Sequence, residues 1–127
     1  MPTLTLPYPP SANRLWRHFR GRVVKSDEAR AYQHMAGMEA LRSGVVMSES
    51  PVRAVLVVHP KKPKRYKAGD RPRCIDRSNA IKVVEDALNG IAWIDDSLID
   101  DIRVMRGHPI DGGALIIRWE LIEDFEA

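Results

Sequence analysis

The chain has 127 residues, one cysteine (Cys74) and a formal net charge of +3 at pH 7. This length predicts a single domain over residues 1–127, and one cysteine excludes both a disulfide framework and a zinc ribbon. No apolar stretch approaches the ~20 residues that span a bilayer, and the N-terminus lacks a signal-peptide pattern, so we expect a cytoplasmic protein with no membrane partner.

The charges are segregated along the chain. Residues 1–82 hold 17 of the 20 basic and 6 of the 17 acidic residues, a net charge of +11, whereas residues 83–127 hold 3 basic and 11 acidic residues, a net charge of −8. The basic part indicates a polyanionic partner. The acidic part would repel that partner if the two folded side by side, unless carboxylates held a divalent cation between them.

The first half of the chain predicts a strand, a basic segment and a helix. Residues 2–6 alternate in hydropathy, as strands do, and the prolines of PYPPSANR end that strand. Residues 14–25 are basic, with aromatic residues interleaved. Ser26 is a favourable N-cap for a helix that ends near Arg42. Four side chains of this helix are expected to be buried: Ala31, Tyr32, Met35 and Met38.

The second half predicts three strands and one helix. Residues 52–59 are apolar and β-branched, which favours a buried strand, and residues 60–73 form a loop rich in Pro, Gly, Lys and Arg. A helix is expected over 78–89, followed by strands at 99–106 and 114–121 that we interpret as a β-hairpin. The order β-α-β-α-β-β predicts an α+β fold, a mixed or antiparallel sheet with two main helices on one face.

The second helix carries a polar stripe opposite its apolar residues. At 100° per residue the stripe contains Ser78, Lys82, Glu85, Asp86 and Asn89. One interpretation is a solvated face with Lys82–Glu85 and Lys82–Asp86 pairs, each worth roughly 0.2–0.5 kcal/mol.

Acidic residues on both sides of this helix support a second interpretation. Asp76 precedes the helix, and Asp95 and Asp96 follow it. Metal-dependent phosphodiester hydrolysis needs carboxylates that converge from different elements, and a nearby lysine can stabilise the phosphate transition state. The helix is about 18 Å long, so the two ends of the site can meet only if the chain turns back after it.

Two basic clusters supply the other half of such a site. We interpret them as surfaces that contact a nucleic-acid backbone, with a merely solubilising loop as the alternative for the second. The first contains Arg14, Arg17, His18, Arg20, Arg22 and Lys25, and the second contains Lys61, Lys62, Lys64, Arg65, Lys67, Arg71 and Arg73. Trp16, Phe19 and Tyr66 are candidates to stack on splayed bases, although aromatic residues more often lie in the core.

Two stretches, LTLPYPPSANRLWRHFRGR at 4–22 and CIDRSNAIKVVEDALNGIAWIDD at 74–96, resemble the RusA family of Holliday junction resolvases. The resemblance covers nearly the whole chain in residue type, order and spacing. It implies a RusA-like fold and a homodimer, often phage- or prophage-encoded, that binds four-way branched DNA. It also implies symmetric cleavage with Mg²⁺ or Mn²⁺, and no nucleotide cofactor.

The family's site residues map onto four positions. Asp76 and Asp96 match its catalytic, metal-binding acids, Lys82 matches its catalytic lysine, and Asn79 matches its asparagine. The predicted DNA-binding set comprises Asn79 together with Asn13, Arg14, Arg17 and Arg20 and the cluster from Lys61 to Arg73.

One position departs from the family's pattern. Ser78 stands where the family has a second aspartate, which removes a charge and a metal ligand. Glu85 lies two turns later on the same helix face, so it is a candidate replacement, with Asp86 or Asp95 as support. With this candidate replacement for the missing aspartate, the leading interpretation remains a Holliday junction resolvase.

Three alternatives stay open. Ser78 makes a catalytically impaired, branched-DNA-binding dimer the first of them. A structural protein whose oppositely charged halves pair between subunits is the second. An RNA substrate is the third, because no residue is identified that reads a 2′-hydroxyl.

Overall fold

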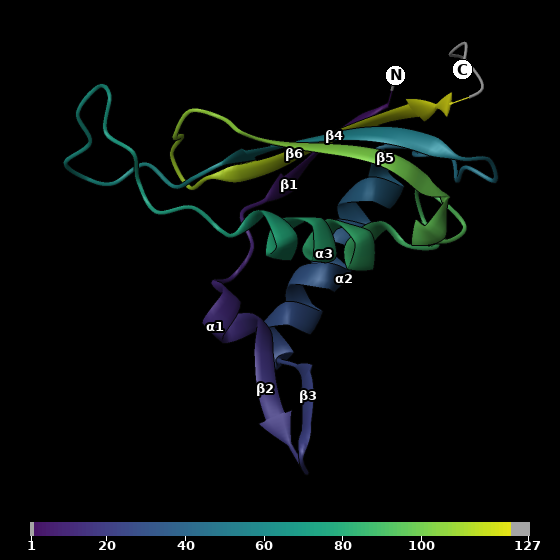
Figure 1. The fold of residues 1–127 in the computed structure, drawn as a ribbon, viewed down its shortest axis with the longest axis horizontal. Helices are drawn as coiled ribbons and strands as arrows, with labels where there is room; N and C mark the ends of the chain where they lie inside the picture. Colours follow the sequence, from purple (N-terminus) through teal and green to yellow (C-terminus); the bar gives the residue numbers. More distant parts are fainter. Residues whose placement is uncertain (1, 123–127) are drawn as a thin grey trace.

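The computed structural model describes residues 2–122, apart from the side chains of residues 12 and 13. The elements are β1 (Thr3–Pro7), α1 (Ala12–Leu15), β2 (Trp16–Phe19), β3 (Arg22–Lys25), α2 (Asp27–Arg42), β4 (Val52–His59), α3 (Arg77–Leu88), the short 3-10 helix η1 (Asp96–Leu98), β5 (Ile99–Arg106) and β6 (Ala114–Leu121). Helices α2 and α3 cover one face of a four-stranded sheet, as Figure 1 shows. The predicted α+β fold is confirmed. None of the described helices is long and apolar enough to cross a membrane.

The sheet has the strand order β1-β6-β4-β5. Strand β4 pairs with β5 in parallel and with β6 antiparallel, and β1 pairs antiparallel with β6. The predicted β5–β6 hairpin is therefore wrong, because β4 lies between these strands. Strand β4 is the most continuously apolar strand and takes the centre, whereas the charged residues of β5 suit an edge. Helix α3 makes the crossover that a parallel β4–β5 pair requires.

The core lies between the sheet and the two helices. Alternate side chains of β4 are buried on the helix side, with Leu56 fully inaccessible between Val104 of β5 and Ile117 of β6. The buried face of α3 packs onto this layer through Ala80, Val84, Ala87 and Leu88. This packing fixes the direction of α3 across the sheet and so determines where its polar stripe points.

Replacing Leu56 by alanine is expected to lower the free energy of unfolding by about 2–5 kcal/mol, because it leaves a cavity at the centre of the sheet. Urea denaturation measures this change. Val55→Ala is the matched control, since Val55 is next in the strand but only half-buried on the opposite face, and it should cost less. Equal losses for the two variants would contradict this assignment of the core face.

Helix α2 begins where predicted, but its buried face differs. The Ser26 hydroxyl caps it by accepting the Ala29 N–H at 3.1 Å. Of the four side chains expected to be buried, only Tyr32 is; Ala31, Met35 and Met38 are exposed. The buried residues are instead mostly small: Ala29, Tyr32, Ala36, Gly37 and Ala40. Small residues let α2 approach α3 closely, which the larger methionines would prevent.

The basic segment 14–25 forms structure that the sequence did not predict. After the short helix α1, strands β2 and β3 pair antiparallel as a separate two-stranded hairpin. Figure 1 shows this hairpin projecting from the helical side of the molecule, away from the sheet.

Candidate active site

Helix α3 carries the central part of the site. It begins one residue before the prediction, with Asp76 as its N-cap, and ends at Leu88. Ser78 and Lys82 lie exposed on the polar face, while Glu85 is half-buried. The predicted polar stripe is therefore confirmed.

The turn after α3 brings a carboxylate back to the helix. The Gly90 N–H bonds to the Trp93 carbonyl at 2.8 Å, and Gly90 has a φ of 79°, a conformation that favours glycine. The Trp93 side chain is completely buried and packs edge-on against Trp119, with ring centroids 5.6 Å apart. This anchored turn places Asp96 next to the last turns of α3.

Glu85 and Asp96 form a carboxylate pair. Partial burial raises the pKa of Glu85, and the adjacent Asp96 carboxylate raises it further by repulsion and by a hydrogen bond. Lys82 acts in the opposite direction but more weakly. Two carboxylates held together beside a lysine concentrate oxygen ligands and negative charge, which is the environment that a hard divalent cation prefers.

Lys82 is oriented by Asp86. Its Nζ lies 3.3 Å from Asp86 Oδ1, while Nζ of Lys25 in β3 lies 3.1 Å from Asp86 Oδ2. Gln33 of α2 donates to the Asp86 carbonyl at 2.8 Å and accepts from Lys25 at 3.0 Å. The Asp86 carboxylate is thus engaged by two lysines rather than turned toward Glu85. The Lys82 side chain remains 54% exposed and accessible to a phosphate.

Asp95 is directed elsewhere. Its Oδ2 accepts the Ser97 N–H at 3.1 Å and caps η1. Hydrogen bonds from the Ser97 hydroxyl and N–H, and from the Asn89 amide, lower the pKa of Asp95. Asp95 is therefore adjacent to Asp96 in the sequence, but its carboxylate caps η1 and does not join the Glu85–Asp96 pair.

Asp76 lies at the other end of α3. Nine residues separate it from Glu85, which corresponds to about 14 Å along the helix axis. Its carboxylate makes no capping hydrogen bond with the helix. Within residues 2–122, no three carboxylate, imidazole or thiolate groups converge closely enough to hold a metal ion by themselves. The structure thus brings Glu85 and Asp96 together and leaves Asp76 apart.

Asp76 lines a pocket of about 460 Å³ that also contains three arginines, Arg71, Arg77 and Arg106. The side chain of Arg106 donates to the Pro72 carbonyl and so attaches the basic loop to the end of β5. Arg77 and Arg106 were not among the predicted site residues. Arg77 adjoins Asp76 in the sequence, which was an available signal, whereas only the parallel β4–β5 pairing brings Arg106 to this end of α3.

The predicted DNA-binding residues fall on two surfaces. The exposed basic side chains of the loop are Lys61, Lys62, Lys64, Arg65, Lys67, Arg71 and Arg73, and this loop leads into α3 (Figure 1). Arg17 and Arg20 lie on the β2–β3 hairpin, and Arg14 is paired with Glu28 at 2.8 Å. Asn79 is half-buried on α3. The side chain of Asn13 lies outside the described part of the structure.

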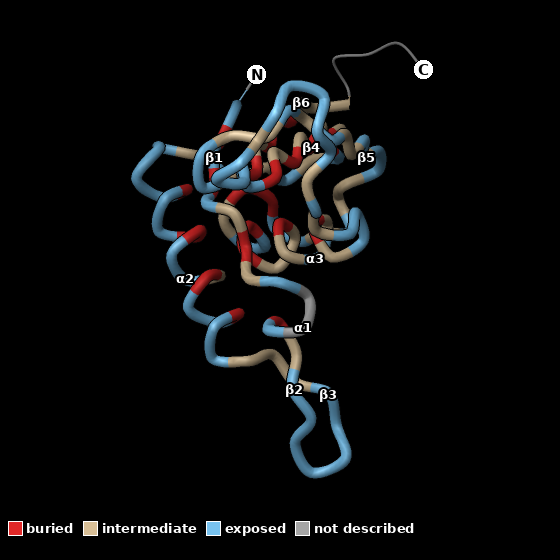
Figure 2. The backbone as a smooth tube through the Cα atoms, turned by 90° about the vertical axis from the view of Figure 1, so that its left-hand side faces the viewer, coloured by how far each residue is buried: buried red, intermediate tan, exposed pale blue. Residues whose placement is uncertain are grey.

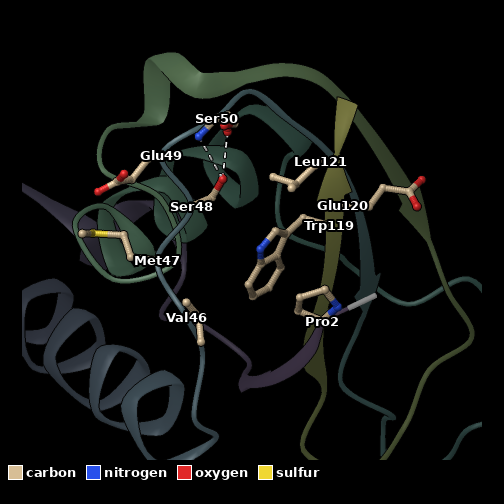
Figure 3. A pocket seen from close by; sticks show the side chains of 9 residues that line it. All are labelled: Pro2, Val46, Met47, Ser48, Glu49, Ser50, Trp119, Glu120 and Leu121. Atoms are coloured by element: carbon tan, nitrogen blue, oxygen red, sulfur yellow. Dashed lines mark hydrogen bonds between the residues drawn. The ribbon is translucent and has the colours of Figure 1, made fainter. Parts of the chain in front are cut away.

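A second pocket, of about 560 Å³, lies between the start of β1, the end of β6 and residues 46–50. Figure 3 shows its lining, which includes Val46, Met47 and Trp119 with two acids, Glu49 and Glu120. None of the described residues that line it is basic, so its chemistry does not suit a polyanion. The paired carboxylates and Lys82 remain the candidate site.

The sequence is similar to known proteins over most of its length. Residues 7–117 match the sequence model of the family described as Endodeoxyribonuclease RusA. The chain is 36% identical over 118 residues to Crossover junction endodeoxyribonuclease RusA of Escherichia coli O139:H28, covering 89% of this chain and 88% of that protein. It is 35% identical to the protein of the same name from Escherichia coli K12, with the same coverage, and 35% identical over 117 residues to that of Enterobacteria phage 82, covering 88% of each chain. The chain therefore belongs to the RusA family of endodeoxyribonucleases.

Proposed function

We propose that this protein is a crossover junction endodeoxyribonuclease that resolves Holliday junctions during DNA recombination and repair. The observation that carries the proposal is the Glu85–Asp96 carboxylate pair beside Lys82, on the helix that holds the family's motif. Two basic surfaces flank this helix and suit the phosphates of the junction arms. The protein acts in the cytoplasm of a bacterial cell, and a phage relative is consistent with a phage or prophage origin.

The family's divalent-metal requirement fits the ligands present. Mg²⁺ keeps several waters and takes one or two carboxylates together with substrate phosphate oxygens, so Glu85 and Asp96 suffice on the protein side. We propose Mg²⁺ as the natural ion, with Mn²⁺ able to substitute. When bound, the ion polarises the scissile phosphate and activates water for attack.

The remaining residues bind and orient the DNA. The Lys82 ammonium, held by Asp86, stabilises negative charge that develops on the phosphate. Asp76 supplies a further carboxylate at the arginine-lined pocket, where the backbone of one arm enters. Paired nicks need two such sites, so the working form is a homodimer.

Glu85→Gln separates the metal role of this residue from a structural one. The raised pKa means that folded protein binds the Glu85 proton more tightly than unfolded chain does. Without metal, stability therefore falls as the pH rises from the ordinary glutamate pKa through the raised one. The glutamine variant should lose this dependence and melt at a higher temperature at pH 7.5, yet cut junctions about 100-fold more slowly.

Thermal melts in EDTA across this pH range, beside single-turnover cleavage with Mg²⁺, measure both effects. Glu39→Gln, an exposed acid on α2, is the matched control and should change neither. A Glu85→Gln protein that cuts as fast as the unchanged one would remove Glu85 from the metal site.

The direct test of function is cleavage of a synthetic four-way junction with Mg²⁺ or Mn²⁺, beside a linear duplex and an Asp76→Asn variant. Paired symmetric nicks that the variant loses would support the resolvase. Junction binding without nicking would instead favour the catalytically impaired dimer, and Ser78→Asp would then be expected to restore cleavage. No preference for the junction over the duplex would overturn the proposal.

A further inference from the structure

The β2–β3 hairpin is a basic projection with an aromatic side chain at its tip. Figures 1 and 2 show it extending away from the body of the molecule, exposed along most of its length. Phe19 is 48% exposed there, although burying a phenylalanine is ordinarily favourable by about 1.5–3 kcal/mol. The position of this ring therefore needs an explanation other than core packing.

The strand register places arginines around the ring. Phe19 lies opposite Arg22, and Arg17 lies two residues before Phe19 on the same face of the hairpin. The guanidinium carbon of Arg17 lies 5.9 Å from the Phe19 ring centroid, and that of Arg20 lies 5.2 Å from it. One face of the hairpin tip is thus a flat apolar ring edged by positive charge.

The turn has an arginine at a position where glycine or asparagine would adopt the backbone conformation at a lower energetic cost. Arg20 and Gly21 both have positive φ, 50° and 75°, as a two-residue hairpin turn requires. Within residues 2–122, Arg20 is the only residue other than glycine with a positive φ. Asn or Gly is usual there, and for other residue types this left-handed conformation costs about 1–2 kcal/mol. An arginine at this position indicates that charge at the tip has a use.

The base of the hairpin is fixed to the candidate site. The Ser26 N–H donates to the Leu15 carbonyl at 2.9 Å, and Leu15 itself is buried. Lys25 reaches Asp86, the same carboxylate that orients Lys82. The base of the hairpin is therefore attached to α3, as a DNA-positioning element would need to be.

We propose that the hairpin is a wedge that enters the branch point of a four-way junction. Phe19 stacks on a base exposed where the arms meet, while Arg17, Arg20 and Arg22 bind the adjacent phosphates. This inference rests on the proposed function. Bases at a branch point can lose a stacking neighbour, and an aromatic ring replaces that neighbour whatever the sequence, because every base has a π face. The surrounding positive charge favours DNA over an apolar protein partner.

The test uses a four-way junction with 2-aminopurine either at the branch point or in the middle of one arm. Protein is added in EDTA, so that binding is observed without cleavage. Unchanged protein is expected to alter the fluorescence of the branch-point probe and not of the arm probe. Phe19→Ala should lose that signal and bind the junction about 5- to 150-fold more weakly, whereas Phe19→Trp should retain both.

Val23→Ala is the matched control, because Val23 is 61% exposed on the opposite face of the same hairpin and should leave signal and affinity unchanged. Unaltered melting temperatures would show that all three variants fold. The unchanged protein is also assayed for junction cleavage with Mg²⁺. If the unchanged protein cuts the junction and Phe19→Ala keeps the full signal and affinity, the wedge proposal is overturned and the proposed function is not. If it neither binds nor cuts, the proposed function falls as well.

Discussion

Asp96→Asn is expected to slow cleavage of a four-way junction by at least about 100-fold while leaving junction affinity in EDTA nearly unchanged. The Asp96 carboxylate lies beside Glu85, so its loss removes one of the two charges that would hold the metal. It also removes repulsion, and the metal-free variant should therefore be no less stable than the unchanged protein. Single-turnover cleavage over a range of Mg²⁺ concentrations measures the first effect.

The control for Asp96→Asn is Asp100→Asn, an exposed acid four residues later on β5 that has no part in the site. It should cut at the normal rate. A shift of the Mg²⁺ requirement to higher concentration in Asp96→Asn would support a ligand role. A normal rate at every Mg²⁺ concentration would contradict the assignment of the Glu85–Asp96 pair as the metal site.

Neutralising the basic loop is expected to have the largest effect on DNA binding. Alanine at Lys61, Lys62, Lys64 and Arg65 removes four exposed charges before α3. If each contacts a phosphate, the slope of log affinity against log salt becomes less steep by up to ~3.6, since each contact contributes about 0.9. Affinity at the lower salt concentrations should fall on the order of 100-fold.

Fluorescence anisotropy between about 50 and about 200 mM salt measures this slope. A matched variant neutralises four exposed arginines outside the two basic surfaces: Arg30, Arg42, Arg103 and Arg118. Both variants lose the same net charge, so a general charge effect would change their slopes equally. That equality would show that the loop does not contact the DNA backbone directly.

The sequence by itself determined the local elements with strong patterns. The bounds of β4, β5 and β6 follow the prediction to the residue, because β-branched and apolar runs are bounded by proline, glycine and charge. The start of α2 follows from Ser26, whose hydroxyl caps the helix as expected. The polar stripe of α3 follows from its 3.6-residue period alone, and the site motif on it identified the family.

Only the tertiary structure decided which elements lie together. Insertion of β4 between β5 and β6 depends on competition among strands for the buried centre, which no single segment encodes. The buried face of α2 also depends on tertiary packing. Its small residues, and not its methionines, face α3, because small side chains allow the two helices to pack closely.

The candidate active site shows most clearly which features depend on local sequence and which depend on tertiary packing. Sequence spacing could place Glu85 and Asp96 near one another only as a hypothesis, whereas burial of Trp93 turns the chain back and makes them neighbours. The Lys25–Asp86 pair and the approach of Arg106 to Asp76 involve residues far apart in the chain. Local sequence fixes the chemical groups, and long-range packing fixes the distances between them.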